Sequence, residues 1–416
     1  IMSSDWSSDV CSSDLSPIKK GGKMNFNKIA RYAIIFIIII VLSVQLPYLY
    51  YKIVDKPITI PRIYFSSIKK DFVYFQYVNR QMNFTDREGN KYNRKEFEKL
   101  LPFTFYRDLN KWGVLPDTIN GLPIDVSVIH HNSDRYRLRG KELDMQTIKL
   151  FPLFESESEF ANLNYPPNFF RITDKIEFIT AKTNDIDSAL TTKFNQALNA
   201  ANFQFPAKMV AGNPTTRKPF DEGYFIVDNS NNVFHMKKIK GEPFLVQTGI
   251  PAMEFKKILI QESVGRKVYG LLINSVNELF MISYDNYQLL PVKLSNYNAD
   301  NMDLTINVNP LFTTVNYDNN FDFYCAAFDS SYNYIDEMKI SLPAKEESLR
   351  EKIKYAIFPF SIDTTDSFSS LIHFSFTPHS GLSIVGIFLS LCLAFVIRIK
   401  RRERLSNNWF DYIIIL

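Results

Sequence analysis

The sequence predicts a mainly β protein with some α-helix, in which a β-propeller-like or repeated antiparallel-sheet periplasmic body lies between two transmembrane helices. Three observations lead to this fold class. Aromatic residues make up 15% of the 416 residues, with 36 Phe and 22 Tyr, and such residues favour strands. A hairpin pattern recurs three times within the second half of the chain. An uncharged apolar run stands near each end.

The first segment, residues 1–23, repeats Ser-Ser-Asp three times and fits neither a helical nor a strand period. Its apolar content is too low for a folded segment. It resembles translated adapter or untranslated sequence ahead of a start codon. We therefore expect the natural protein to begin at Met24, and we treat 1–23 as a non-native leader.

The first apolar run, residues 33–50, carries no charge and is preceded by Lys28 and Arg31. About 18 residues of helix roughly span a hydrocarbon core. A cleaved signal peptide is the alternative, but no small-residue cleavage site follows the run. We expect transmembrane helix 1 here.

The second apolar run, residues 381–397, predicts transmembrane helix 2. The next seven residues, Arg398 to Arg404, carry five positive charges. Because Lys and Arg collect on the cytoplasmic side, both termini are expected in the cytoplasm and the body in the periplasm, at the inner membrane. The basic tail, 398–416, ends in "WFDYIIIL", which fits either a third span cut short or a tail on the membrane surface.

The region 51–165 reads as a mixed α/β periplasmic region. Residues 86–90 form a tight turn with Gly89, and Asn93 can cap a short helix that ends before Pro102. Apolar residues at three- and four-residue steps predict a helix from Ile186 to Ala201, capped by Asp185 or Asp187. A membrane-proximal segment, 344–380, precedes the second apolar run.

The region 166–343 carries the repeated hairpins. Three segments align on a tyrosine that is followed, five residues later, by Asn or Asp and then by Ser. Asx-Ser pairs favour turns because their side chains bond the local backbone. The aligned positions are Tyr224, Asn229 and Ser230; Tyr269, Asn274 and Ser275; and Tyr324, Asp329 and Ser330.

Spacings of 45 and 55 residues between these tyrosines resemble those of four-stranded propeller blades. Three repeats do not close a ring, so residues 125–138 are a candidate fourth, degenerate blade. An open stack of antiparallel sheets is the alternative. Either architecture is typical of binding platforms whose loops recognise a partner.

The loop from Ala211 to Gly223, "AGNPTTRKPFDEG", is the candidate binding site. Its two prolines restrict the backbone and predict an ordered loop. One interpretation is a recognition loop in which Arg217 clamps a carboxylate or phosphate, with Lys218, Asp221 and Glu222 beside it. The other is an internal, ion-paired connection between the preceding helix and the next sheet.

Catalytic chemistry and cofactors are not indicated. The five histidines do not form a metal-binding pattern: His130 and His131 are adjacent and would face opposite sides of a strand, and His235 reads as a sheet-face residue. Cys325 is the one cysteine expected in the folded body, so no internal disulfide is predicted. The sequence shows no phosphate-binding loop, no nucleophile elbow and no basic aromatic stripe for nucleic acid.

Three stretches carry a resemblance to a known family: "FTDREGNKYNRKEFEKLLPFTFYRDL", "LFPLFES" and "AGNPTTRKPFDEGYFIVD". Over nearly all of Met24 to Leu416 the chain resembles a family of exported Bacteroidota membrane proteins that is described as a domain of unknown function. The resemblance implies membrane spans around a periplasmic body, and genes near those of ABC transporters. It carries over no catalytic residues.

Taken together, the sequence predicts a binding or accessory module anchored in the inner membrane, and the family resemblance implies an association with an ABC transporter. Its expected partners are the lipid bilayer and ABC-transporter subunits; no cofactor, metal or nucleic acid is expected. The alternatives are an envelope hydrolase acting on glycan or peptide, and a transmembrane sensor.

Overall fold

The recurring unit of the fold is a four-stranded antiparallel sheet whose strands follow one another in the chain. It is seen in a computed structural model that describes residues 26–54, 60–78, 81–160, 162–342, 349–358, 360–378, 381 and 383–401. The contacts divide the chain into two compact units. Of the described residues, one unit holds those from 60 to 342 and 365–373, and the other holds 26–54, those from 349 to 364 and those from 374 to 401.

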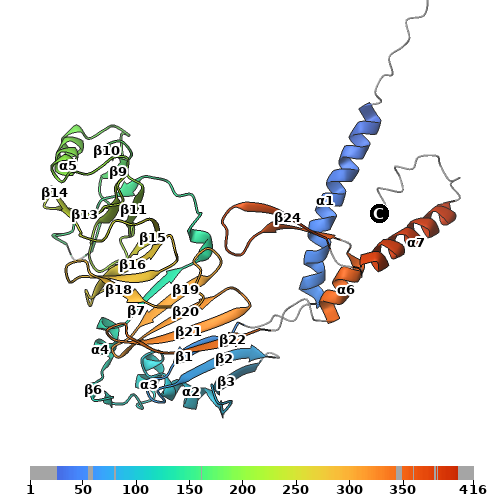
Figure 1. Cartoon of the computed structure of the whole chain (residues 1–416), viewed down its shortest axis with the longest axis horizontal. Helices are drawn as coiled ribbons and strands as arrows, with labels where there is room; N and C mark the ends of the chain where they lie inside the picture. Colours follow the sequence, from blue (N-terminus) through green and yellow to red (C-terminus); the bar gives the residue numbers. More distant parts are fainter. Residues whose placement is uncertain are drawn as a thin grey trace, which may run out of the picture. The chain divides into compact units, whose positions relative to one another are not determined.

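Five sheets build the larger unit (Figure 1). Sheet 1 contains β1 (Arg62–Phe65), β2 (Phe72–Val78), β3 (Gln81–Asp86) and β4 (Lys91–Tyr92). Sheet 2 contains β8 (Phe151–Pro152), β9 (Asn168–Ile172) and β10 (Ile176–Thr180). Sheet 3 contains β11 (Met209–Gly212), β12 (Tyr224–Val227), β13 (Val233–Ile239) and β14 (Glu242–Gln247).

Sheet 4 contains β15 (Phe255–Ile260), β16 (Val268–Asn274), β17 (Leu279–Ser283) and β18 (Leu289–Val292). Sheet 5 contains β19 (Asp303–Val308), β20 (Phe312–Asp318), β21 (Asp322–Asp329) and β22 (Tyr334–Ser341), with β7 (Asp134–Leu138) added beside β19. A small hairpin joins β5 (Thr118–Ile119) to β6 (Leu122–Pro123).

The helices of this unit are short, and their caps follow the sequence. They are α2 (Arg94–Leu100), α3 (Tyr106–Lys111), α4 (Val126–His131), the 3₁₀ turn Gly140–Glu142 and α5 (Ser188–Ala200). Asn93 and Glu96 form a capping box on α2, and Asp187 caps α5 by accepting from Leu190 N, as predicted. The helix α5 buries Phe194 and Leu198, as its periodicity indicates.

The sheets pack face to face in the order 2, 3, 4, 5, 1, which Figure 1 shows from the green strands through yellow and orange to blue. Alternate residues of one strand serve opposite neighbours. On β12, Tyr224 and Ile226 pack toward sheet 2, and Phe225 and Val227 pack toward sheet 4. All seven residues of β16 are buried, because both faces of its sheet are covered.

Sheet 1 closes the far end of this stack although it comes first in the chain. Its Phe65 and Phe72 share one buried core cluster with Phe323 and Cys325 of β21, and the Phe65 ring contacts Phe312 of β20. The stack is open: each sheet has edges, and none is closed on itself. The repeated antiparallel sheets are therefore confirmed, and the propeller-like ring is not supported.

The three predicted hairpins are confirmed as β12–β13, β16–β17 and β21–β22. In each turn, a side-chain oxygen accepts the N–H of the residue four positions later at 2.8–2.9 Å, and the intervening third residue has positive φ. The accepting residues are Asp228, Asn274 and Asp329. In the first hairpin the acceptor thus lies one residue before the aligned Asn229.

A fourth copy of this turn lies at Asp86, which accepts from Asn90 N at 2.9 Å, with Gly89 at φ 91°. It belongs to sheet 1. The prediction that residues 125–138 form a further blade is wrong, because this segment is the helix α4 followed by the single edge strand β7. His130 and His131 accordingly lie on a helix and not on a strand.

The smaller unit contains α1 (Phe26–Val54), α6 (Leu349–Ile357) and α7 (Ser383–Arg401). The hairpin of β23 (Phe360–Thr365) and β24 (Ile372–Pro378) lies between α6 and α7 in the chain. Gly386 allows α7 to approach α6 closely, since a Cβ there would lie 2.4 Å from Ala356 O.

Helix α1 contains all of the predicted span 33–50, and α7 contains residues 383–397 of the predicted span 381–397. Over the part of the chain that the structure describes, no helix is long and apolar enough to cross a membrane. The prediction that 33–50 and 381–397 are transmembrane helices is therefore not supported. The leader 1–23 and residues 402–416 of the predicted tail lie outside the described residues.

Candidate functional site

The candidate loop connects β11 to β12 at one end of sheet 3. The corresponding connection of sheet 4, residues 261–267, joins β15 to β16. Both are first-to-second strand connections of neighbouring sheets, so they emerge side by side. Asn213 Nδ2 donates to Glu262 Oε2 at 2.8 Å and bonds the two loops directly.

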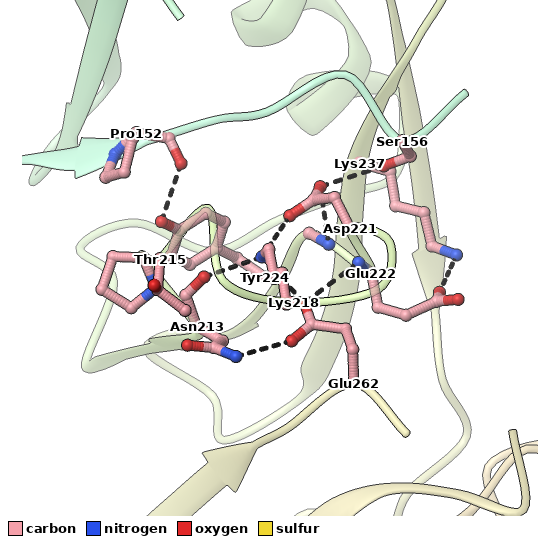
Figure 2. Close-up of polar contacts among 12 residues, drawn as sticks. Pro152, Ser156, Asn213, Thr215, Lys218, Asp221, Glu222, Tyr224, Lys237 and Glu262 are labelled. Carbon is pink, nitrogen blue, oxygen red and sulfur yellow. Dashed lines mark hydrogen bonds and ion pairs between the residues drawn. The ribbon is translucent and has the colours of Figure 1, made fainter. Parts of the chain in front are cut away.

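Lys218 is the centre of a buried network between these loops (Figure 2). Its Nζ donates to Asn213 O at 2.7 Å, Asp221 Oδ1 at 2.6 Å and Glu262 Oε1 at 2.8 Å. An ammonium has three donors, and all three are used. Its side chain is 2% exposed and also lies 4.9 Å from the centre of the Phe154 ring.

The two carboxylates of the network have further donors. Asp221 Oδ2 accepts from Ser156 Oγ at 3.1 Å and from Gly223 N at 3.0 Å. Glu262 Oε1 also accepts from Glu222 N at 3.2 Å. Both carboxylate side chains are fully buried. Burying charge is tolerated when each group is paired and hydrogen-bonded, and this condition is met here.

Glu222 points away from Lys218 and forms a second ion pair with Lys237 of β13. Its backbone oxygen accepts from His235 Nε2 at 2.6 Å. Since Nε2 carries the proton, Nδ1 of His235 accepts from the Tyr287 hydroxyl at 3.0 Å. Burial, opposed by the bond to Glu222 O and helped by the charge of Lys237, lowers the pKa of His235 to about 3, so the imidazole is neutral.

Gly223 ends the loop with φ +67°, and its lack of a side chain lets the start of β12 lie close against β13. A Cβ at this position would lie 2.1 Å from Met236 O. The next residue, Tyr224, donates its hydroxyl to Pro152 O at 2.8 Å and so joins the loop to sheet 2. The loop is thereby fixed to sheets on both of its sides.

The structure separates the four predicted site residues into two groups. Lys218, Asp221 and Glu222 are buried, with 9%, 2% and 4% of their surface exposed. They match the interpretation of an internal, ion-paired connection. Arg217 is exposed, and its guanidinium forms no ion pair with any residue that the structure describes. Of the four, Arg217 is the side chain that a partner in solution reaches.

Several residues of the site were not identified from the sequence. Glu262 lies 44 residues beyond Lys218, at the end of an apolar strand, and such an acidic residue on a strand end was the available signal. Arg266 was also missed; it is exposed and lies 4.0 Å from the centre of the Phe220 ring. His235 and Tyr287 were missed as partners because they lie 52 residues apart.

Within the described residues, no group of three or more His, Cys, Asp or Glu side chains is arranged to hold a metal ion. Cys325 is buried in sheet 5 and is a free thiol. The arrangement around the loop therefore consists of ion pairs and hydrogen bonds that hold the backbone in place.

Comparison with protein families gives one match. A model described as "Domain of unknown function (DUF4857)" matches residues 62–328, well over half of the chain. The chain belongs to this family. No curated protein matches it in sequence.

The DUF4857 match begins at β1 and ends within the last residues of β21. It thus contains sheets 1 to 4, most of sheet 5, the 211–223 loop and Glu262. The expected resemblance to a domain of unknown function is confirmed over this range, which is shorter than the range expected from the sequence. The flanking helices α1, α6 and α7 lie outside it.

Proposed function

We propose that this DUF4857 protein is a non-catalytic binding module whose stack of sheets presents a rigid recognition loop to a partner. One observation carries the proposal. Lys218, Asp221 and Glu262 hold the loop by buried contacts on both sides, whereas Arg217 projects from the same loop without an ion pair among the described residues. A fixed loop with an unpaired guanidinium is a preorganised contact for an anionic group.

The rigidity of the loop favours binding over a mobile linker. Ordering a loop on binding reduces affinity by the entropy that is lost, and a loop already held in place avoids this loss. Binding residues are often found on loops that a rigid scaffold positions. Here the scaffold is the stacked pair of sheets 3 and 4.

The proposed location rests on the sequence alone. Apolar runs at 33–50, after Lys28 and Arg31, and at 381–397, before a stretch with five basic residues, favour an anchor in the inner membrane with the body in the periplasm. The proposed partners are the lipid bilayer at the anchor and ABC-transporter subunits at the body. This part of the proposal follows the family resemblance to exported Bacteroidota proteins.

The alternative of an envelope hydrolase has weaker support. A general acid or nucleophile must reach the substrate. The carboxylates at the loop are buried and bonded to Lys218 or Lys237. A sensor role has no specific observation in its favour.

Affinity purification from the native host tests the proposal. The full chain, tagged at one terminus, is recovered after mild crosslinking, and its stoichiometric partners are identified by mass spectrometry. The matched variants are Arg217→Ala and Lys182→Ala; Lys182 is also exposed and unpaired among the described residues. We expect a partner that Arg217→Ala loses and Lys182→Ala keeps. Recovery of the chain alone would contradict the proposal.

A further inference from the structure

The end of sheets 3 and 4 that carries the candidate loop also carries two further exposed cations. We call this surface the loop edge and define it as residues 213–222, 261–267 and 284–288. Arg217, Arg266 and Lys267 are all exposed, and none of them forms an ion pair with a described residue. Assigning a ligand to the loop edge rests on the proposed binding function and makes that function more specific.

Direct contacts hold the three segments of the loop edge together. Asn213 bonds Glu262 across the first two segments, and the Arg266 guanidinium lies 4.0 Å from the centre of the Phe220 ring. Tyr284 N donates to Lys267 O at 3.1 Å and attaches the third segment. The three cations therefore share one surface and are not scattered over the body.

The loop edge as a whole is neutral, with four cations (Arg217, Lys218, Arg266 and Lys267) and four carboxylates (Asp221, Glu222, Glu262 and Asp285), but its exposed side chains are mostly cationic. Asp221 and Glu262 pair with Lys218, and Glu222 pairs with Lys237, all of them buried or nearly so. Asp285 is exposed on the third segment. Asp134 accepts from the Ser263 hydroxyl of the second segment, and its charge interacts with that of Lys267. An excess of cationic side chains remains at the surface, which favours an anionic ligand.

The way Arg266 is held suits a carboxylate. Its guanidinium carbon lies over the Phe220 ring, 4.0 Å from the ring centre, and this contact forms no hydrogen bond. The N–H donors lie in the plane of the guanidinium and stay free to form two parallel bonds with one carboxylate. Arg217 offers the same fork from the neighbouring loop.

Aromatic rings stand beside these cations. Tyr165 is 59% exposed, and its hydroxyl donates to Pro214 O at 3.5 Å, so its ring lies next to the loop of Arg217. Phe220 and Tyr287 are partly exposed. Tyr287 has φ 56°, an uncommon value for an aromatic residue, and is held there by its bond to His235 and by stacking on Tyr269.

We propose that the loop edge binds an acidic glycan, with uronate carboxylates on Arg217 and Arg266 and sugar rings against Tyr165 and Phe220. A sugar ring has an apolar face of C–H groups that packs on an aromatic side chain, and a uronate adds the carboxylate that each guanidinium accepts. An acidic peptide supplies the carboxylates but not the ring faces, so the glycan accounts for both features of the surface.

The test measures binding of fluorescein-labelled oligogalacturonate to the full chain in mild detergent, by fluorescence anisotropy. A labelled malto-oligosaccharide of equal length is the neutral glycan, and poly-L-glutamate of equal charge is the acidic peptide. We expect oligogalacturonate to bind more tightly than either. The double variant R217A/R266A should weaken this binding about tenfold or more.

Two variants control for net charge and for folding. K149A/K182A removes two exposed cations outside the loop edge and should change the affinity less than about twofold. R217K/R266K keeps the charges without the planar forks and should give an intermediate affinity. Thermal unfolding of each variant verifies that the body is intact.

Equal or tighter binding of poly-L-glutamate would overturn the glycan assignment in favour of an acidic peptide. Failure of oligogalacturonate to bind, or binding that R217A/R266A leaves unchanged, would also overturn it. These failures are distinct from failure of the proposed function. A protein partner that depends on Arg217 in the native host keeps the binding module and removes only the glycan.

Discussion

Lys218 Nζ lies 2.8 Å from Glu262 Oε1, and this ion pair joins the first loop of sheet 3 to the first loop of sheet 4. The two residues are 44 positions apart, and both side chains are buried. The pair fixes where the candidate loop stands and therefore where Arg217 projects. It is the contact on which the proposed recognition surface depends.

Removing the cation of this pair should strongly destabilise the body. Lys218→Met leaves the carboxylates of Asp221 and Glu262 buried without their shared partner. We expect the free energy of unfolding to fall by about 3–5 kcal/mol. Urea unfolding of the full chain in detergent measures the change.

The matched control for this variant is Lys182→Met, which removes an exposed lysine and should change the free energy of unfolding by less than about 0.5 kcal/mol. A loss below about 1 kcal/mol for Lys218→Met would contradict the account, because the network would then not hold the loop.

The neutral His235 should make stability depend on pH. Its pKa falls to about 3 in the folded protein, below the unfolded value of about 6.5. The stabilisation is fully present above pH 6.5 and is lost as the pH falls toward 3, because the unfolded chain binds the proton first. We expect a loss of roughly 3–5 kcal/mol from this group over that range.

Unfolding free energies measured from pH 7 to pH 4 for the wild type and for His235→Gln isolate this effect. The variant should be less stable at pH 7 and should show a shallower fall with pH. His130→Gln is the control, because it replaces an exposed histidine on a helix. Parallel pH profiles for the wild type and His235→Gln would show that His235 is not held neutral.

Asp318 should change stability with pH in the direction opposite to that of His235. It faces Asp303 across the β19–β20 ladder, and burial raises its pKa to about 6, with the neighbouring carboxylate adding to the shift. A folded pKa above the unfolded value means that stability falls as the pH rises from about 4 to about 6. The penalty is then fully present at pH 7.

Asp318→Asn should therefore raise the free energy of unfolding at pH 7 by about 1–2 kcal/mol, after allowance for partial exposure. At pH 3.5 the gain should vanish, since the aspartate is then protonated in both states. A variant that is equally or less stable than the wild type at pH 7 would sink this interpretation.

The side-chain acceptor of a repeated turn should contribute more to the free energy of unfolding where the turn is buried. Asp228→Ala removes the acceptor for Ser230 N, Asn232 N and the Asn232 side chain at a fully buried position, together with a longer bond from Gln204 N. We expect a loss of about 2–3 kcal/mol. Asp329→Ala removes the same bonds from the exposed third hairpin, where water replaces them, and should lower stability by about 1 kcal/mol. Equal losses would contradict this assignment.

Local chemistry made much of the fold predictable. The Asx turns, the Asn93 and Asp187 caps and the α5 periodicity each depend on residues within a few positions of one another. The order of the sheets was not predictable, because it depends on long-range contacts. The Phe65 and Phe312 rings lie 5.1 Å apart, centre to centre, although the two residues are more than 240 positions apart in the sequence, and no local pattern signals such a pairing.

The candidate site was predicted only in part, again because some of its contacts join residues that are far apart in the sequence. Two prolines marked the loop as ordered, but Lys218 and Arg217, adjacent cations in the sequence, have opposite fates in the structure. What distinguishes them is Glu262, a partner from the next sheet. The prediction of a blade at residues 125–138 was wrong because the Asn-Ser pair there follows a helix and not a strand.

Site-specific photocrosslinking tests the central claim most directly. Arg217→p-benzoylphenylalanine places a reactive group on the proposed recognition loop, and Lys182→p-benzoylphenylalanine places one on an exposed loop elsewhere. After irradiation of native host cells, we expect a discrete crosslinked partner or glycan adduct from position 217 and none from position 182. Identical patterns from the two positions, or no adduct at 217, would contradict the claim that this loop binds a partner.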